Sequence, residues 1–201
     1  MDWRIVGESA ISRGGLRVVI PKLDHATGYL PVGRYPATVS EVEAQFVTGR
    51  SPRRSEVWGH WQQATELLRS HVEVLSAWIG GSFLSVTDEP DDIDCVYWVE
   101  DLELSKAGLN PDSHAILGAF ARQKVIRQTL ELRVDTFLVP WHCQENLSEL
   151  SSDYSQVYYR QRGYWDDFWQ RRRSGGKYDP PRREDALPRR GYLEVMLDGY
   201  R

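Results

Sequence analysis

The stretch "WIGGSFLSVTDEPDDIDCVYWV" (residues 78–99) decides the fold. An apolar run stops at Gly80-Gly81-Ser82, and a second apolar run begins with Asp92 and Asp94, which one isoleucine separates. Side chains at positions i and i+2 of a strand share a face, so the two aspartates project together, away from the residue between them. The stretch therefore predicts two strands joined through a glycine turn, with a pair of carboxylates at the start of the second strand.

The composition is that of one globular domain. The chain has 201 residues, of which 41% are hydrophobic and 27% charged, so it is long enough to bury a core. No apolar run approaches the ~20 residues of a membrane span, and the first ten residues lack the layout of a secretion signal. Cys95 and Cys143 form neither a disulfide framework nor a zinc spacing. These features predict a cytoplasmic protein without a membrane segment.

The charge is distributed unevenly along the chain. Residues 160–190 hold ten Lys and Arg against five Asp and Glu, whereas the remaining chain holds 15 against 24. An acidic body with one basic segment fits a localised contact with an anion better than a general coat for nucleic acid.

The periodicity along the chain predicts a mixed α/β (α+β) core, with a mixed sheet flanked by helices. Thr38 followed by Glu41 is a capping box that opens a short helix. Three segments are expected: an N-terminal arm with that helix (1–55), the core (56–140), and a C-terminal helical extension with the basic segment (141–201). The predicted strands are 16–23, 75–81, 92–99, 130–140 and 192–197, the predicted helices are 40–47, 55–75, 110–130 and 150–173, and 28–37 is expected to be an extended arm or loop.

The aspartates have two interpretations. Two carboxylates on one face repel each other and raise each other's pKa unless a cation compensates, and carboxylates at this spacing suit Mg²⁺. The plainer interpretation is an acidic turn that runs into a strand. Asp135 favours the metal, because an acid within the apolar run "LRVDTFLV" needs a partner. The glycine turn favours it too, since glycines and the Ser82 hydroxyl there can hold phosphate.

Three motifs together resemble the DNA polymerase β-like nucleotidyltransferase superfamily. They are Ile79-Gly80-Gly81-Ser82, then Asp92-Ile93-Asp94-Cys95, then Val134-Asp135-Thr136. The resemblance covers residues 56–140, and the size of the chain is similar to that of minimal single-domain members found in bacterial toxin–antitoxin and antiviral-defence systems.

The resemblance implies a metal-dependent transferase that moves a nucleoside monophosphate from ATP or another NTP or dNTP to an acceptor hydroxyl. Asp92, Asp94 and Asp135 would be the catalytic acids and the ligands of two Mg²⁺ ions, with Mn²⁺ as a substitute. Gly80, Gly81 and Ser82 would bind the nucleotide phosphates. The acceptor stays open between a nucleotide or oligonucleotide, an RNA and a protein, and a cognate partner protein is also expected in such systems.

A second class of function competes with the enzyme. The chain would then be a non-catalytic, antitoxin-like partner protein that keeps the nucleotidyltransferase fold. The aromatic residues of the basic segment bear on this choice, because Trp165, Phe168 and Trp169 recur at helical spacing. That spacing favours packing of a helix on the sheet over stacking on nucleic-acid bases. The arginines at 171–173 fit either an anion contact or the C-terminal end of a helix dipole.

Overall fold

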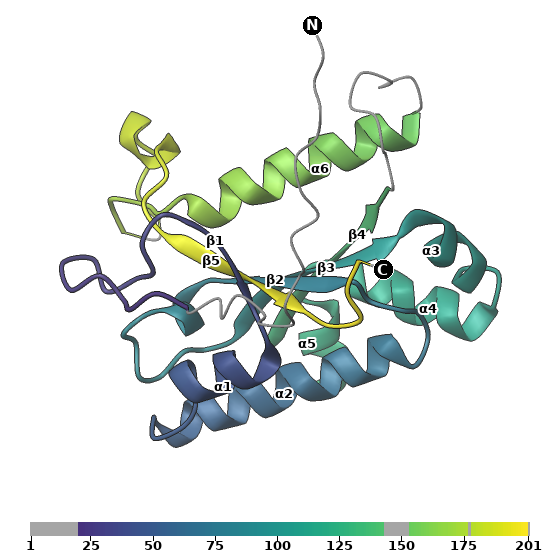
Figure 1. The fold of residues 1–201 in the computed structure, drawn as a ribbon, viewed down its shortest axis with the longest axis horizontal. Helices are drawn as coiled ribbons and strands as arrows, with labels where there is room; N and C mark the ends of the chain where they lie inside the picture. The colour runs from purple at the N-terminus through teal and green to yellow at the C-terminus, as the bar shows by residue number, and fades with distance from the viewer. Residues whose placement is uncertain (1–19, 143–152, 177, 201) are drawn as a thin grey trace, which may run out of the picture.

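One five-stranded mixed sheet organises the protein, and helices cover both of its faces (Figure 1). The computed structural model describes residues 20–142, 153–176 and 178–200. The strand order is β1-β5-β2-β3-β4, with β2 antiparallel to both of its neighbours and with parallel pairs at the two edges. The strands are β1 (Gly33–Ala37), β2 (Ser76–Gly80), β3 (Ile93–Glu100), β4 (Val134–Trp141) and β5 (Gly191–Met196).

The helices divide between the two faces of this sheet. Figure 1 shows α1, α2, α4 and α5 below the sheet and α6 above it, while α3 follows β3 directly. Two short 3₁₀ turns, η1 and η2, follow β2 and precede β5. The bounds are α1 (Val39–Phe46), α2 (Pro52–Arg69), η1 (Ser82–Leu84), α3 (Asp101–Ala107), α4 (Pro111–Phe120), α5 (Val125–Leu130), α6 (Asp153–Gln170) and η2 (Arg183–Ala186). The predicted fold class, a mixed sheet flanked by helices, is therefore confirmed.

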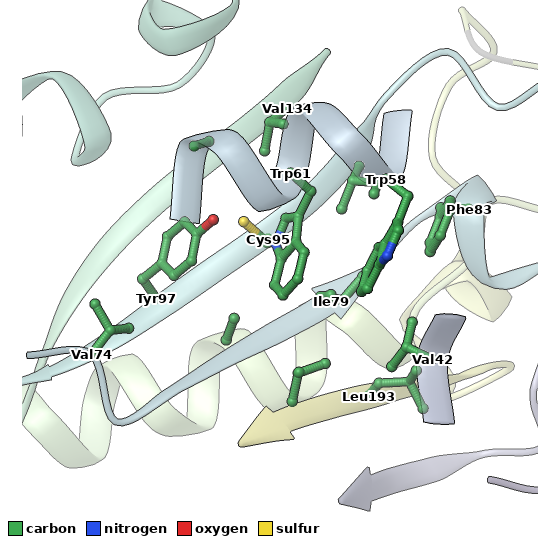
Figure 2. Packing of buried hydrophobic residues seen from close by; sticks show 14 of the residues in the cluster. Val42, Trp58, Trp61, Val74, Ile79, Phe83, Cys95, Tyr97, Val134 and Leu193 are labelled. Atoms are coloured by element: carbon green, nitrogen blue, oxygen red, sulfur yellow. The ribbon is translucent and has the colours of Figure 1, made fainter. Parts of the chain in front are cut away.

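The lower core forms because α2 carries one apolar stripe. Its predicted positions Val57, Trp61, Ala64 and Leu68 are all buried. Figure 2 shows Trp61 beside Cys95, on the side of the sheet that faces α2. The capping box that the sequence predicts at the start of α1 is present in both of its hydrogen bonds. Local sequence signals thus account for this layer.

The upper core is aromatic and belongs to α6. Trp165 and Trp169 are buried against the sheet, as their helical spacing predicts, and they pack with Trp78 and Trp98 in one cluster. Phe168 was predicted to pack on the sheet together with these tryptophans, and this is wrong, because its side chain is 43% exposed. It lies on the outer side of the helix, where it stacks on Tyr164 and makes edge-on contacts with the rings of Trp165 and Trp169.

Several predicted boundaries differ from the structure. The helix expected at 110–130 is two helices, because the chain turns at 121–124 and Lys124 takes a left-handed conformation with φ of 64°. The strand expected at 16–23 is absent from its described part, 20–23, and the rest of it lies outside the described residues. Pro140 does not close β4, since it pairs with Val99 and the strand continues for one more residue.

The two ends of the chain complete the sheet. The extended arm at 28–37 supplies β1, and the last predicted strand is β5, which lies between β1 and β2. The central strand β2 therefore has β5 as its partner on one side. Within the described ranges, no helix is long and apolar enough to span a membrane.

A buried arginine fixes the loop that follows η1. Arg54 is fully buried in α2, and its guanidinium donates hydrogen bonds of 2.6–3.1 Å to the main-chain carbonyls of Phe46, Phe83, Ser85 and Thr87. It also lies over the ring of Phe83, 5.4 Å from the centroid. The side chain thus holds the segment after the glycine turn against the end of α1.

We expect Arg54→Met to lower the free energy of unfolding by about 3 kcal/mol or more, since several buried carbonyls lose their donor. The neighbouring Arg53, whose ion pairs lie near the surface, is the matched control. Arg53→Met should cost less than about 1 kcal/mol. Urea unfolding of both variants measures the difference, and equal losses would contradict the role assigned to Arg54.

Candidate active site

The strand register brings the predicted acids to one corner of the sheet. Gly80 of β2 pairs with Asp94 of β3, which in turn pairs with Asp135 of β4. Residues directly opposite each other on neighbouring strands share a face. Asp92, two residues before Asp94, projects to the same side. The three carboxylates therefore lie on the face covered by α6, and the charge of Asp135 acts to raise the pKa of both Asp92 and Asp94.

Among the three acids, Asp94 is the one that has no hydrogen-bond donor within the described residues. No residue within the described ranges donates a hydrogen bond to its carboxylate, and the residue is half-buried. Burial raises the pKa of Asp94 to about 7, and the charges of Asp92 and Asp135 act in the same direction. Arg190 and Arg127 oppose this rise, but neither forms an ion pair with Asp94. Within the described ranges, Asp94 therefore has no ion pair that would neutralise its carboxylate.

The two other carboxylates have donors within the protein. Asp92 accepts a hydrogen bond of 2.6 Å from Arg127 of α5, although burial still raises its pKa. Asp135 is buried and accepts hydrogen bonds from the Gln123 side chain (3.0 Å) and from the Lys124 main-chain N–H (2.7 Å). Both of these donors lie in the turn between α4 and α5, so the unpredicted break in that helix holds Asp135 in place.

The donor set suits a hard divalent cation, although its side chains are not gathered as ligands. In the part of the chain that the structure describes, no three His, Cys, Asp or Glu side chains are grouped to hold a metal ion. The cause is visible in the contacts, because Asp92 is turned to Arg127 and Asp135 to its two N–H donors. Three carboxylates on one face, one of them without a donor, nevertheless have the chemistry that Mg²⁺ requires.

The predicted phosphate-binding turn lies against Asp94. Gly81 has φ of 79° and ψ of −162°, a conformation that side chains rarely adopt, and a Cβ there would overlap the Oδ2 atom of Asp94. A Cβ at Gly80 would overlap the ring of Trp169 in α6. Ser82 begins η1, and its hydroxyl makes no hydrogen bond to another described residue. Only glycine fits at the two positions between the sheet and its neighbours.

Sequence reasoning missed the cationic and amide groups around the acids. Arg127 and Gln123 gave no local signal, since charged and polar residues are ordinary on a helix surface. Arg190 belongs to the basic segment that the charge distribution singled out, yet nothing in the sequence placed it near Asp94. It reaches the site because it directly precedes β5, which pairs with β2.

Comparison with known proteins gives one family. The match is to DUF6932, described as a family of unknown function, and it spans residues 21–196. Neither the curated proteins nor the solved structures yielded a match.

We expect Gly81→Ala to destabilise the protein by about 3 kcal/mol or more, because it combines backbone strain with overlap on Asp94. Gly49 is the matched control, since its φ is 70° and a Cβ there would meet nothing within 4 Å. Gly49→Ala should cost only about 1 kcal/mol of strain. Chemical denaturation of a Gly81→Ala and Asp94→Ala double-mutant cycle tests the contact, and additive effects would rule it out.

The raised pKa of Asp94 predicts a pH-dependent stability in metal-free buffer. The folded state binds the proton more tightly than the unfolded chain, so this contribution is full below the unfolded pKa of ~3.9 and is lost as the pH rises through about 7. Asp94→Asn should remove that decline and be more stable than the parent protein above neutral pH. Urea unfolding across this range in EDTA measures it. The exposed Asp112→Asn is the control, and an unchanged slope in Asp94→Asn would refute the assignment.

Proposed function

The chain belongs to the DUF6932 family, and because the function of that family is unknown, we propose from the site that the protein is a metal-dependent nucleotidyltransferase. It would transfer a nucleoside monophosphate from an NTP or dNTP to an acceptor hydroxyl and release pyrophosphate. The acceptor is a nucleotide or oligonucleotide, an RNA or a protein, and the resemblance to minimal superfamily members favours a role in antiphage defence or in a toxin–antitoxin pair.

One observation carries the proposal. Asp94, which no described residue supplies with a hydrogen bond, stands between two further carboxylates on one face and the Gly81 turn on the neighbouring strand. A protein that used these acids only for stability would pair each of them with a donor, because unpaired like charges are costly when buried. The arrangement supports a cation-dependent site next to a place where the backbone can approach an anion.

The residues divide the chemistry between them. Asp92, Asp94 and Asp135 would hold two Mg²⁺ ions, which when bound neutralise the triphosphate and align it for in-line displacement. Asp135, fixed by Gln123 and Lys124, suits orientation of the acceptor hydroxyl and acceptance of its proton. A bond then forms between the acceptor oxygen and the α-phosphorus, while the bond to the β-phosphate oxygen breaks and its electron pair leaves with pyrophosphate. The Ser82 hydroxyl is available to donate a hydrogen bond to a phosphate oxygen.

A second function is favoured by the ion pair between Asp92 and Arg127. Together with the two N–H donors of Asp135, this pair compensates two of the three acids without any metal. Such compensation fits a non-catalytic partner protein that retains the fold. In the enzyme, by contrast, Asp92 would have to exchange Arg127 for the cation. Activity with labelled nucleotides separates the two functions.

We expect the protein, incubated with Mg²⁺ or Mn²⁺ and each α-labelled NTP and dNTP, to release pyrophosphate and label an acceptor. Asp94→Asn, which keeps the size of the side chain, should lower the rate about 100-fold or more, because a ligand charge is lost where charge must be neutralised. The control is Glu89→Gln, in the same acidic run and with a side chain 65% exposed, which should keep full activity. Full activity of Asp94→Asn would end the enzyme assignment. Absence of transfer with every nucleotide would favour the partner protein.

A further inference from the structure

A cationic cluster lies beside the glycine turn and is built from residues outside the segment 56–140 that carries the family resemblance. Its centre is the Tyr29 ring, with the guanidinium of Arg172 4.7 Å and that of Arg190 5.8 Å from the ring centroid. We call these three residues the Tyr29 cluster. They come from the N-terminal arm, the segment that follows α6 and the residue before β5.

The position of Tyr29 is fixed relative to the predicted phosphate-binding turn. Tyr29 forms an antiparallel β-bridge with Ser85, three residues after Ser82. Next to it, the Val86 N–H donates a hydrogen bond of 2.9 Å to the carbonyl of Gly28. These contacts connect the cluster to the loop that follows the glycine turn. Within the cluster, the Arg190 guanidinium is close enough to Asp94 to interact with it electrostatically.

Arg190 has unused hydrogen-bond donors. Its Nε donates to the Trp169 carbonyl at 3.0 Å, but its two terminal nitrogens make no hydrogen bond to any residue in the described ranges. The side chain is partly buried, and burial lowers the pKa of Arg190, with Arg172 acting in the same direction. A guanidinium remains charged at neutral pH despite such shifts. The cluster therefore presents a fork of N–H donors and a fixed positive charge near Asp94.

Arg172 adds a second positive charge, which lines a cavity. The Arg172 guanidinium is exposed and makes one long hydrogen bond, of 3.4 Å, to the Thr27 carbonyl. It lines a cavity of about 430 Å³ together with Thr27, Arg173, Ser174 and Arg189, and none of these lining residues is acidic. Arg189 has an ion pair with Glu184, whereas the Arg172 guanidinium lies over the Tyr29 ring as well as lining the cavity. Two guanidinium groups that share one aromatic ring repel each other, and an anion between them would remove that repulsion.

We propose that the Tyr29 cluster binds the polyphosphate chain of the nucleoside triphosphate, beyond the glycine turn, and holds the pyrophosphate as it leaves. This inference rests on the proposed function, because the acids and the turn define where the α-phosphate lies. When the bond between the α-phosphorus and the bridging oxygen breaks, its electron pair stays on pyrophosphate. The guanidinium forks of Arg190 and Arg172 match phosphate oxygens in geometry and charge.

The test measures binding of an anion without catalysis. Sodium tripolyphosphate is titrated by calorimetry into the 201-residue protein in EDTA. The parent protein is compared with Arg172→Gln, Arg190→Lys and Arg183→Gln. Arg172→Gln should weaken binding about tenfold, since an exposed site loses a charged hydrogen-bond donor without a folding penalty. Arg190→Lys keeps the charge but loses the fork, and it should also weaken binding several-fold. Arg183→Gln removes an exposed charge from the same segment and should change affinity less than about twofold.

The outcomes separate this inference from the proposed function. Equal affinity for tripolyphosphate in the parent protein, Arg172→Gln and Arg190→Lys would overturn the inference. So would a loss in Arg172→Gln that affects binding of a 5′-hydroxyl oligoribonucleotide but leaves tripolyphosphate unchanged. If Arg172→Gln loses tripolyphosphate and no nucleotide is ever transferred, the polyphosphate site stands and the nucleotidyltransferase fails. If Asp94→Asn alone abolishes transfer while both arginine variants bind tripolyphosphate normally, the enzyme stands and the cluster does not.

Discussion

The in-register parallel pairing of β3 with β4 is the constraint on which the site depends. It sets Asp94 directly opposite Asp135, on strands whose spacing is ~4.8 Å. A slip of one residue would turn one of these acids to the face where Trp61 and Ile79 pack, and a carboxylate buried there would have no partner. The apolar residues of that lower face therefore fix the register, and the register in turn sets how near the acids stand. The repulsion between the acids is a consequence of good packing on the opposite side of the sheet.

The sequence was sufficient wherever the cause was local. The shared face of Asp92 and Asp94 follows from the two-residue period of a strand, and the capping box at Thr38 follows from the spacing of its two members. The stripe of α2 follows from helical periodicity in the same way. The glycine turn could also be predicted, because an apolar run that ends in two glycines indicates that the strand stops there in a turn. In each case the residues that interact are neighbours in the chain.

What the sequence did not reveal depends on contacts between distant segments. The turn at 121–124 contains neither Gly nor Pro, so nothing local predicts that the helix stops there. Lys124 adopts its left-handed conformation while its N–H is bound to the carboxylate of Asp135, which lies on β4. That hydrogen bond offsets a strain of about 1 kcal/mol and supplies the acid with a donor at the same time. Hydrophobic periodicity cannot predict this break in the helix, because its cause is a hydrogen bond to a distant strand.

The ends of the chain matter to the site for a related reason. A core limited to 56–140 would contain all three acids and the glycine turn, but β2 would then have lost β5 along one edge. Trp169, which fills the space over Gly80, and Arg190, whose charge acts on Asp94, both belong to the segment after 140. Tyr29 comes from the opposite end, and its bridge to Ser85 fixes the loop beyond Ser82. The motif supplies the carboxylates, whereas the surrounding segments supply the side chains that cover the glycine turn and the positive charge. The proposed phosphate-binding chemistry requires both, so the proposed site draws on residues from the N-terminal arm to the residue before the last strand.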